Sequence, residues 1–171
     1  CPLITFTSAI FILFLLLNLL FPLNDAVEYS TIIEDSKGDV IHAFLTSDQK
    51  WRMYVELNEI SPQLKKAIIC KEDKYFMYHP GINLFAVFRA AATNLIRSKR
   101  TSGASTLTMQ VARMLAPKER SYANKFIEVF RALQLEWKYS KMEILQLYLN
   151  LVPYGGNIKR IKSASVLYWG K

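Results

Sequence analysis

The sequence predicts a mainly helical domain that follows an apolar anchor helix and a short β-hairpin. Three observations support this fold class. Residues 3–23 carry no charged side chain, residues 27–46 are rich in β-branched and aromatic residues around a turn cluster, and from Ser61 onward apolar residues recur at helical spacing. We therefore divide the chain into an anchor (1–23), a linker with a hairpin (24–60) and a helical domain (61–171).

The apolar segment 3–23 has the length of a membrane-spanning helix. At 1.5 Å per residue it would extend ~31 Å, which matches the hydrocarbon thickness of a bilayer. A cleaved secretory signal is the alternative, but the run exceeds a typical signal core and no small-residue cleavage site follows it. Residues 24–35 contain no Lys or Arg. Because cytoplasmic flanks are usually basic, we expect the domain to lie outside the cytoplasm.

Positive charge is concentrated in the second part of the chain. The whole sequence of 171 residues has 22 Lys+Arg and 14 Asp+Glu, yet residues 1–49 hold one basic residue, Lys37, against six acidic ones. No acidic residue lies between Asp73 and Glu119. Such a stretch suits an anionic partner, although solvated helix faces are the simpler interpretation. Nucleic acid, lipid headgroups and a pyrophosphate all stay open at this point.

The hairpin and the helices can be placed by their turn and capping residues. Strands are predicted over 27–33 and 39–45, and Ser61 with Pro62 begins the first helix of the domain. Ser140 and Glu143 form a capping box for the last predicted helix. The helices that the periodicity predicts run over 62–72, over 83–97 before a polar break at 98–103, from a cap at Ser105 or Thr106 to about 115, over 121–138, and over 141–150.

Two groups of acidic residues are candidates for chemistry. Glu72 and Asp73 follow an apolar helix face and lie close to His79 in the sequence. A carboxylate in such a place can serve as a general base, but adjacent acids at a helix end are more often solvent-facing. Glu128 lies near Lys125 on a predicted helix, where a surface ion pair is its simplest role.

A third candidate is the predicted helix start at Ser105 and Thr106, with Gln110 one turn further on. Backbone N–H groups at a helix start bind phosphate well, although a plain capping role fits the same residues. Each of these three signals is weak when taken alone.

Taken in order, these stretches resemble the motifs of the family-51 peptidoglycan glycosyltransferases. The pattern E-D-x-x-F-x-x-H-x-G stands as EDKYFMYHPG at 72–81, and G-x-S-T-x-x-x-Q stands as GASTLTMQ at 103–110. R-K-x-x-E appears as NKFIE, with Asn124 in place of arginine, and K-x-x-I-L-E-x-Y-L-N appears as KMEILQLYLN, with Gln146 in place of glutamate. Residues 24–171 look most similar to the C-type class A penicillin-binding proteins.

The resemblance implies a lysozyme-like glycosyltransferase domain, incomplete at its C-terminal end, that polymerises lipid II into glycan strands and releases undecaprenyl pyrophosphate. It implies that Glu72 is the general base and that Glu128 is the second catalytic residue, which positions substrate or a divalent ion. The residues that it assigns to substrate binding are Asp73, His79, Ser105, Thr106, Gln110, Arg113, Arg120 and Lys125.

The same resemblance implies no tightly bound cofactor, with a divalent cation (Mg²⁺ or Mn²⁺) left open. The expected partners are lipid II, the growing glycan strand and the membrane, with no nucleic acid, and a transpeptidase domain is expected to follow in the full-length protein. The expected location is the inner (cytoplasmic) membrane, single-pass, with the domain on the periplasmic side. Two alternatives are a membrane-anchored lysozyme-like enzyme that cleaves glycan with Glu72 and Glu128, and a non-catalytic module that binds anionic glycan or lipid.

Overall fold

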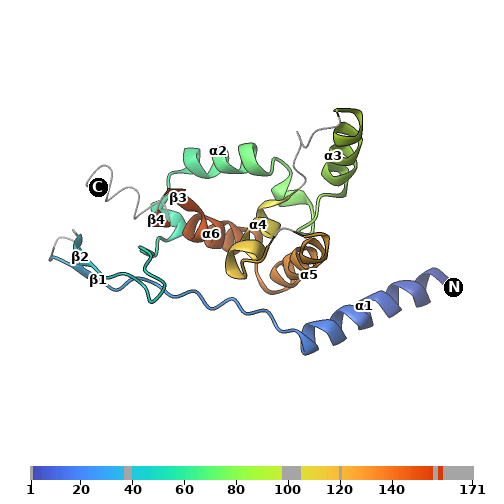
Figure 1. Ribbon diagram of the computed structural model, residues 1–171, viewed down its shortest axis with the longest axis horizontal. Helices are drawn as coiled ribbons and strands as arrows, with labels where there is room; N and C mark the ends of the chain where they lie inside the picture. The colour runs from blue at the N-terminus through green and yellow to red at the C-terminus, as the bar shows by residue number, and fades with distance from the viewer. Residues whose placement is uncertain (1, 37–39, 98–104, 120, 156–157, 160–171) are drawn as a thin grey trace.

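The computed structural model describes residues 2–36, 40–97, 105–119, 121–155 and 158–159. Helix α1 and the β1–β2 hairpin lie outside the helical body, at opposite ends of the view in Figure 1. The elements are α1 (Pro2–Leu20), β1 (Ile32–Glu34), β2 (Val40–Ala43), α2 (Pro62–Glu72), α3 (Leu84–Arg97), α4 (Leu107–Leu115), α5 (Tyr122–Lys138), α6 (Lys141–Leu151), β3 (Pro153–Gly155) and β4 (Ile158–Lys159), with single 3₁₀ turns at Leu57–Glu59 and Phe76–Tyr78. The mainly helical class is confirmed.

The helices begin at the capping residues that the sequence predicts. The Ser61 side chain accepts a hydrogen bond from the Leu64 N–H, and Thr106 rather than Ser105 caps α4. Ser140 closes its capping box with Glu143 at the start of α6. These caps satisfy backbone N–H groups that a helix start leaves without partners, so they fix where each helix begins. The predicted polar break at 98–103 lies outside the described residues.

The core lies where α4 packs against α5 and α6. The side chains of α4 and α6 supply most of the buried apolar residues, and α5 adds Leu135. Phe76, from the turn after α2, is also fully buried in this cluster. Six of the completely buried core residues are Leu107, Val111, Leu135, Ile144, Leu145 and Leu149. Burying a side chain of this size stabilises the fold by roughly 1.5–3 kcal/mol.

The hairpin is confirmed but is shorter than predicted. β1 and β2 are antiparallel, with Ile33 opposite His42. Before β1, Ser30 pairs with Arg52 instead of with β2. The Ser30 N–H donates to the Arg52 carbonyl (2.9 Å), and the Ser30 hydroxyl accepts from the Arg52 N–H (2.7 Å). His42 is exposed, and its ring meets the Phe44 ring edge-to-face at 4.7 Å between centroids.

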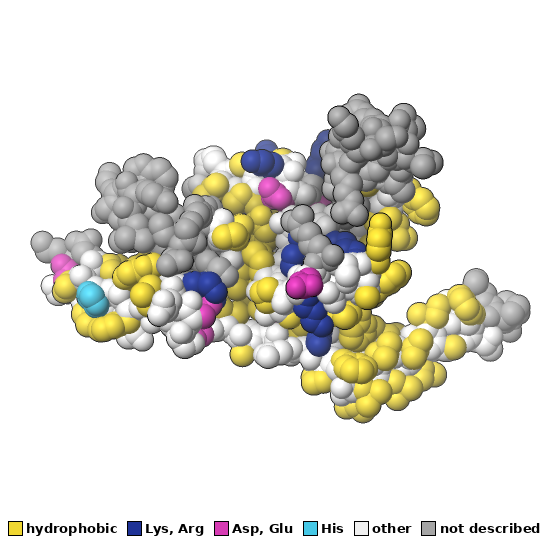
Figure 2. Space-filling model, viewed as in Figure 1, with side chains coloured by type: hydrophobic (Ala, Val, Ile, Leu, Met, Phe, Trp, Pro, Cys, Tyr) yellow, Lys and Arg dark blue, Asp and Glu magenta, His cyan; other side chains and the backbone are white. Residues whose placement is uncertain are grey.

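Helices α1 and α3 each expose several large apolar side chains. Leu84, Phe85 and Phe88 of α3 are 66%, 72% and 74% exposed. Most of the described side chains of α1 are apolar and solvent-exposed, and they form the hydrophobic surface at lower right in Figure 2. Within the described ranges, we find no helix that has both the length and the apolar character needed to cross a bilayer. The single-pass anchor over 1–23 stays a prediction.

Gly81 occupies a position where any side chain is strained. Its φ is +81°, and a Cβ atom would lie 2.8 Å from Cγ of Glu136 and 3.2 Å from the Ala132 carbonyl oxygen. We expect Gly81→Ala to lower the free energy of unfolding by about 2 kcal/mol, because the left-handed backbone and the contact with α5 both oppose a methyl group. Urea unfolding measures this change. A loss below about 0.5 kcal/mol would show that α5 shifts aside to admit the methyl group.

Candidate active site

Glu72, the proposed base, lies beside Gln110. α2 ends at Glu72, which is exposed, and the carboxylate accepts a hydrogen bond from Nε2 of Gln110 on α4 at 3.2 Å. Tyr148 of α6 lies close enough to Glu72 for the charge of Glu72 to change its pKa. Burial, and then the nearby charge of Glu72, raise the pKa of Tyr148 to about 12. Three helices therefore bring residues of the first, second and fourth motifs together around one carboxylate.

A cationic cluster surrounds Glu128 on α5. Nε of Arg113 lies 2.7 Å from one carboxylate oxygen, and Nη2 of Arg113 and Nζ of Lys125 lie 3.0 Å and 2.7 Å from the other. The Ser105 hydroxyl accepts hydrogen bonds from Lys125 at 2.8 Å and from Arg113 at 3.4 Å. The single carboxylate of Glu128 thus binds two cations and neutralises only part of their charge. The cluster keeps a net positive charge, which suits an anionic ligand.

Burial and the two cations act in opposite directions on Glu128. Burial raises the pKa of Glu128, but the hydrogen bonds and the positive charges of Arg113 and Lys125 together outweigh it and lower the pKa below its ordinary value. The same bond to Glu128 raises the pKa of Arg113. Glu128 and Arg113 are therefore both charged at neutral pH.

This lowered pKa predicts a pH-dependent stability. A carboxylate with a depressed folded-state pKa stabilises the protein fully above its ordinary pKa of 4.5 and loses that contribution as the pH falls through the folded value. We expect wild type to unfold less readily than Glu128→Gln at pH 7, and the difference to shrink below pH 4.5. Unfolding free energies measured across this range test it. A difference that does not change with pH would contradict the ion-pair interpretation.

Glu72 and the cationic cluster are joined through α4. Gln110 and Arg113 are three residues apart on this helix, so their side chains project from neighbouring positions on one face. Gln110 contacts Glu72, whereas Arg113 contacts Glu128. The partner of Glu72 and a partner of Glu128 are therefore held side by side on one helix.

Asp73 and His79 connect the end of α2 to the start of α4. Oδ2 of Asp73 accepts a hydrogen bond from the Leu107 N–H at 3.0 Å and lies 3.0 Å from Nε2 of His79. The Asp73 residue is 7% exposed, and Nδ1 of His79 has no partner among the described residues. The two side chains orient the segment that follows Glu72, and their contact with substrate stays a prediction.

The buried Thr106 also has a structural role, like Asp73 and His79. It is 2% exposed, its hydroxyl donates to the Gly81 carbonyl at 2.6 Å, and it also caps α4. Ser105 differs, because its hydroxyl faces the two cations. Arg120, the remaining residue that the motifs assign to substrate, lies outside the described residues.

The sequence analysis did not predict a partly buried ion pair between Glu136 and Lys141. Glu136 accepts hydrogen bonds from the Thr108 hydroxyl at 2.6 Å and from Nζ of Lys141 at 2.7 Å. Lys141 also donates to the His79 carbonyl at 2.6 Å and lies over the Phe76 ring. The position of Lys141 at the start of the fourth motif was the available signal, but its partners are distant in sequence.

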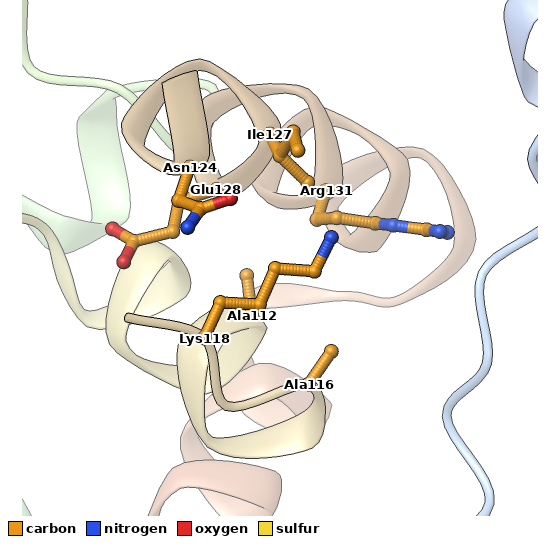
Figure 3. Close-up of a pocket in the computed structure, with 7 residues that line it drawn as sticks. All are labelled: Ala112, Ala116, Lys118, Asn124, Ile127, Glu128 and Arg131. Carbon is orange, nitrogen blue, oxygen red and sulfur yellow. The ribbon is translucent and has the colours of Figure 1, made fainter. Parts of the chain in front are cut away.

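A small pocket of about 40 Å³ lies on the other side of Glu128, between α4 and α5. Figure 3 shows Lys118 extending from the segment after α4 toward α5, whereas Arg131 points away from Glu128 toward the N-terminal segment. The lining residues are Ala112, Ala116, Lys118, Asn124, Ile127, Glu128 and Arg131.

The described residues do not fit a resident divalent cation. Both oxygens of Glu128 are engaged by Arg113 and Lys125, and Mg²⁺ needs free oxygen ligands. In the described part of the chain, no group of three His, Cys, Asp or Glu residues is arranged to hold a metal ion.

The fold and this arrangement define the class of protein. A family model described as Transglycosylase matches residues 37–171, so the chain belongs to the transglycosylase family. It is 42% identical to penicillin-binding protein 1C of Escherichia coli (strain K12) over 98% of this chain and 22% of the relative. It is 40% identical to penicillin-binding protein 1A of the same organism over 81% of this chain and 16% of the relative.

A relative from a second organism matches over a similar share of this chain. Penicillin-binding protein 4 of Bacillus subtilis (strain 168) is 36% identical over 80% of this chain and 22% of its own length. The chain thus spans about a fifth of the length of the curated relatives that it matches. The family that the four motifs indicate is confirmed.

Proposed function

We propose that this chain is a peptidoglycan glycosyltransferase that polymerises lipid II into glycan strands for the bacterial cell wall. The observation that supports it best is the pairing on α4, where Gln110 holds Glu72 and Arg113 belongs to the cationic cluster, in a chain of the transglycosylase family. The reaction needs both parts, since a sugar hydroxyl is a poor nucleophile and the leaving pyrophosphate is strongly anionic.

In the proposed mechanism, Glu72 takes the proton of the acceptor 4-hydroxyl as its oxygen attacks the anomeric carbon of the growing strand. The bond from this carbon to the pyrophosphate oxygen breaks, and undecaprenyl pyrophosphate leaves with inversion. Arg113, Lys125 and Ser105 bind the pyrophosphate and stabilise the charge that develops on it. Glu128 keeps the two cations in place, and Gln110 orients Glu72.

The experiment is polymerisation of lipid II by the purified protein in vesicles, with the length of the glycan products measured. Long strands support the transferase. Shortening of preformed strands would indicate the glycan-cleaving alternative, and binding of lipid II without turnover would indicate the non-catalytic module. The relatives are named penicillin-binding proteins, and we propose that a transpeptidase domain accompanies this domain in the full-length protein.

We also propose that the protein works at the outer face of the inner membrane, with residues 1–23 as a single-pass anchor. The exposed apolar surfaces of α1 and α3 support a lipid contact, because large apolar patches are rare on water-facing surfaces. Cys70 of α2 is exposed and provides a probe of topology. A membrane-impermeant maleimide should label Cys70 in spheroplasts and leave Cys70→Ser unlabelled at that site. Labelling of Cys70 only after lysis would overturn the orientation.

A further inference from the structure

Side chains of α5 bind the C-terminal end of α1. Nη1 of Arg131 donates to the Phe21 carbonyl at 3.2 Å and to the Pro22 carbonyl at 2.6 Å. Nε2 of Gln134 donates to the Phe21 carbonyl at 2.9 Å and to Oδ1 of Asn18 at 2.6 Å. The carbonyls at a helix end have no partners within the helix, and a cation there also meets the negative end of its dipole.

Gln134 is committed to this contact. Gln134 is 2% exposed. Its Oε1 accepts a hydrogen bond from Nη1 of Arg131 at 3.0 Å, and its Nε2 donates to the end of α1. Because a buried amide without partners is costly, separation of α1 from α5 would leave an unfavourable group behind. Gln134 therefore strongly favours the arrangement in which α1 contacts α5 over the one in which they are separated.

Further contacts lie along the same face of α5. Asp25 is held by Nζ of Lys138 and by the Tyr139 hydroxyl, each at 2.5 Å. On the apolar side, Trp137 lies near the Phe11 and Phe14 rings, at 5.9 Å and 6.2 Å between centroids. The end of α1 is thus fixed by groups spread over two turns of α5, which restricts both its position and its angle.

This contact lies one turn from the cationic cluster. Arg131 follows Glu128 by three residues on α5, and both line the pocket in Figure 3. We propose that Arg131 and Gln134 are positioning residues that fix the cationic cluster at a set distance from α1. This inference rests on the proposed function. When α1 lies in lipid, the contact between α1 and α5 sets the height, relative to the membrane, at which Arg113 and Lys125 meet a pyrophosphate. That pyrophosphate is carried on a membrane-embedded chain.

The test compares two substrates in the intact protein. Asn18→Ala and Gln134→Ala should each slow polymerisation of lipid II in vesicles by about tenfold, since a small misplacement of reacting groups is costly. The double variant should be no slower than the slower single variant, because both remove one shared interaction. With a water-soluble short-chain lipid II analogue, all rates should stay within about twofold of wild type. Gln63→Ala, an exposed glutamine on α2, is the matched control.

Each outcome has a defined meaning. Equal losses with both substrates would show a general structural role and overturn the inference, as would unchanged rates in vesicles. Asn18→Ala changes α1 alone, so it remains informative if Gln134→Ala fails to fold. Absence of polymerisation by wild type would overturn the proposed function, whereas an active wild type with unaffected variants overturns the positioning role alone.

Discussion

Glu72→Gln is expected to abolish glycan polymerisation while the protein stays folded. The amide has nearly the shape of the carboxylate but cannot take the acceptor proton, and loss of a general base lowers rates by about 10²–10⁴-fold. Glu72 is exposed at the end of α2 and has one described side-chain hydrogen bond, to Gln110, so its replacement should change the unfolding midpoint little. Rates of lipid II consumption in vesicles, measured beside urea unfolding, separate the two effects.

The matched control is Glu59→Gln. Glu59 closes a capping box by accepting from the Glu56 N–H, and glutamine makes the same bond. This variant should polymerise at the wild-type rate. If Glu72→Gln also retained that rate, Glu72 would have no part in the proton transfer, and the mechanism proposed above would be wrong.

The second large effect is expected from Asp73→Ala, which should lower both stability and turnover. The substitution leaves the buried Leu107 N–H without its acceptor and removes the partner of His79. Loss of a buried charged acceptor of this kind costs about 3 kcal/mol. Because Asp73 adjoins Glu72, the end of α2 should also shift relative to Gln110. Urea unfolding and steady-state kinetics measure the two losses.

The conservative variant Asp73→Asn keeps one carbonyl oxygen for the Leu107 N–H, so it should recover part of the lost stability. A purely substrate-binding Asp73 would behave differently, since its removal would raise KM and leave the unfolding free energy unchanged. That result would overturn the bridging role of Asp73 between α2 and α4.

The helices were predictable because their ends are encoded locally. The hydroxyls of Ser61, Thr106, Ser121 and Ser140 cap the helices that the pattern predicts, and Pro117 follows α4 closely. The hairpin was predicted too long because strand ends depend on partners. Ser30 has strand-forming neighbours but pairs with Arg52 rather than with β2, which local propensity does not encode.

The candidate site was predictable only in part. The motifs supplied Glu72, Gln110, Arg113 and Glu128, and the structure brings these residues together in two adjacent groups. Glu136 was missed because its partners Thr108 and Lys141 come from other helices, so no local sequence pattern indicates these contacts. The contacts of Arg131 with the Phe21 and Pro22 carbonyls were not predictable either, because these partners lie more than a hundred residues away in the sequence.

The placement of Gln110 and Arg113 on one helix has a consequence for how this chain tolerates insertions. Their separation along α4 is about 4.5 Å, set by the rise of the helix and not by contacts between their side chains. One residue added between them would rotate Arg113 by about 100° around the helix axis and carry it away from Glu128. Additions after Leu115 would leave this spacing unchanged. α4 thus acts as a fixed spacer between the contact with Glu72 and the contact with Glu128.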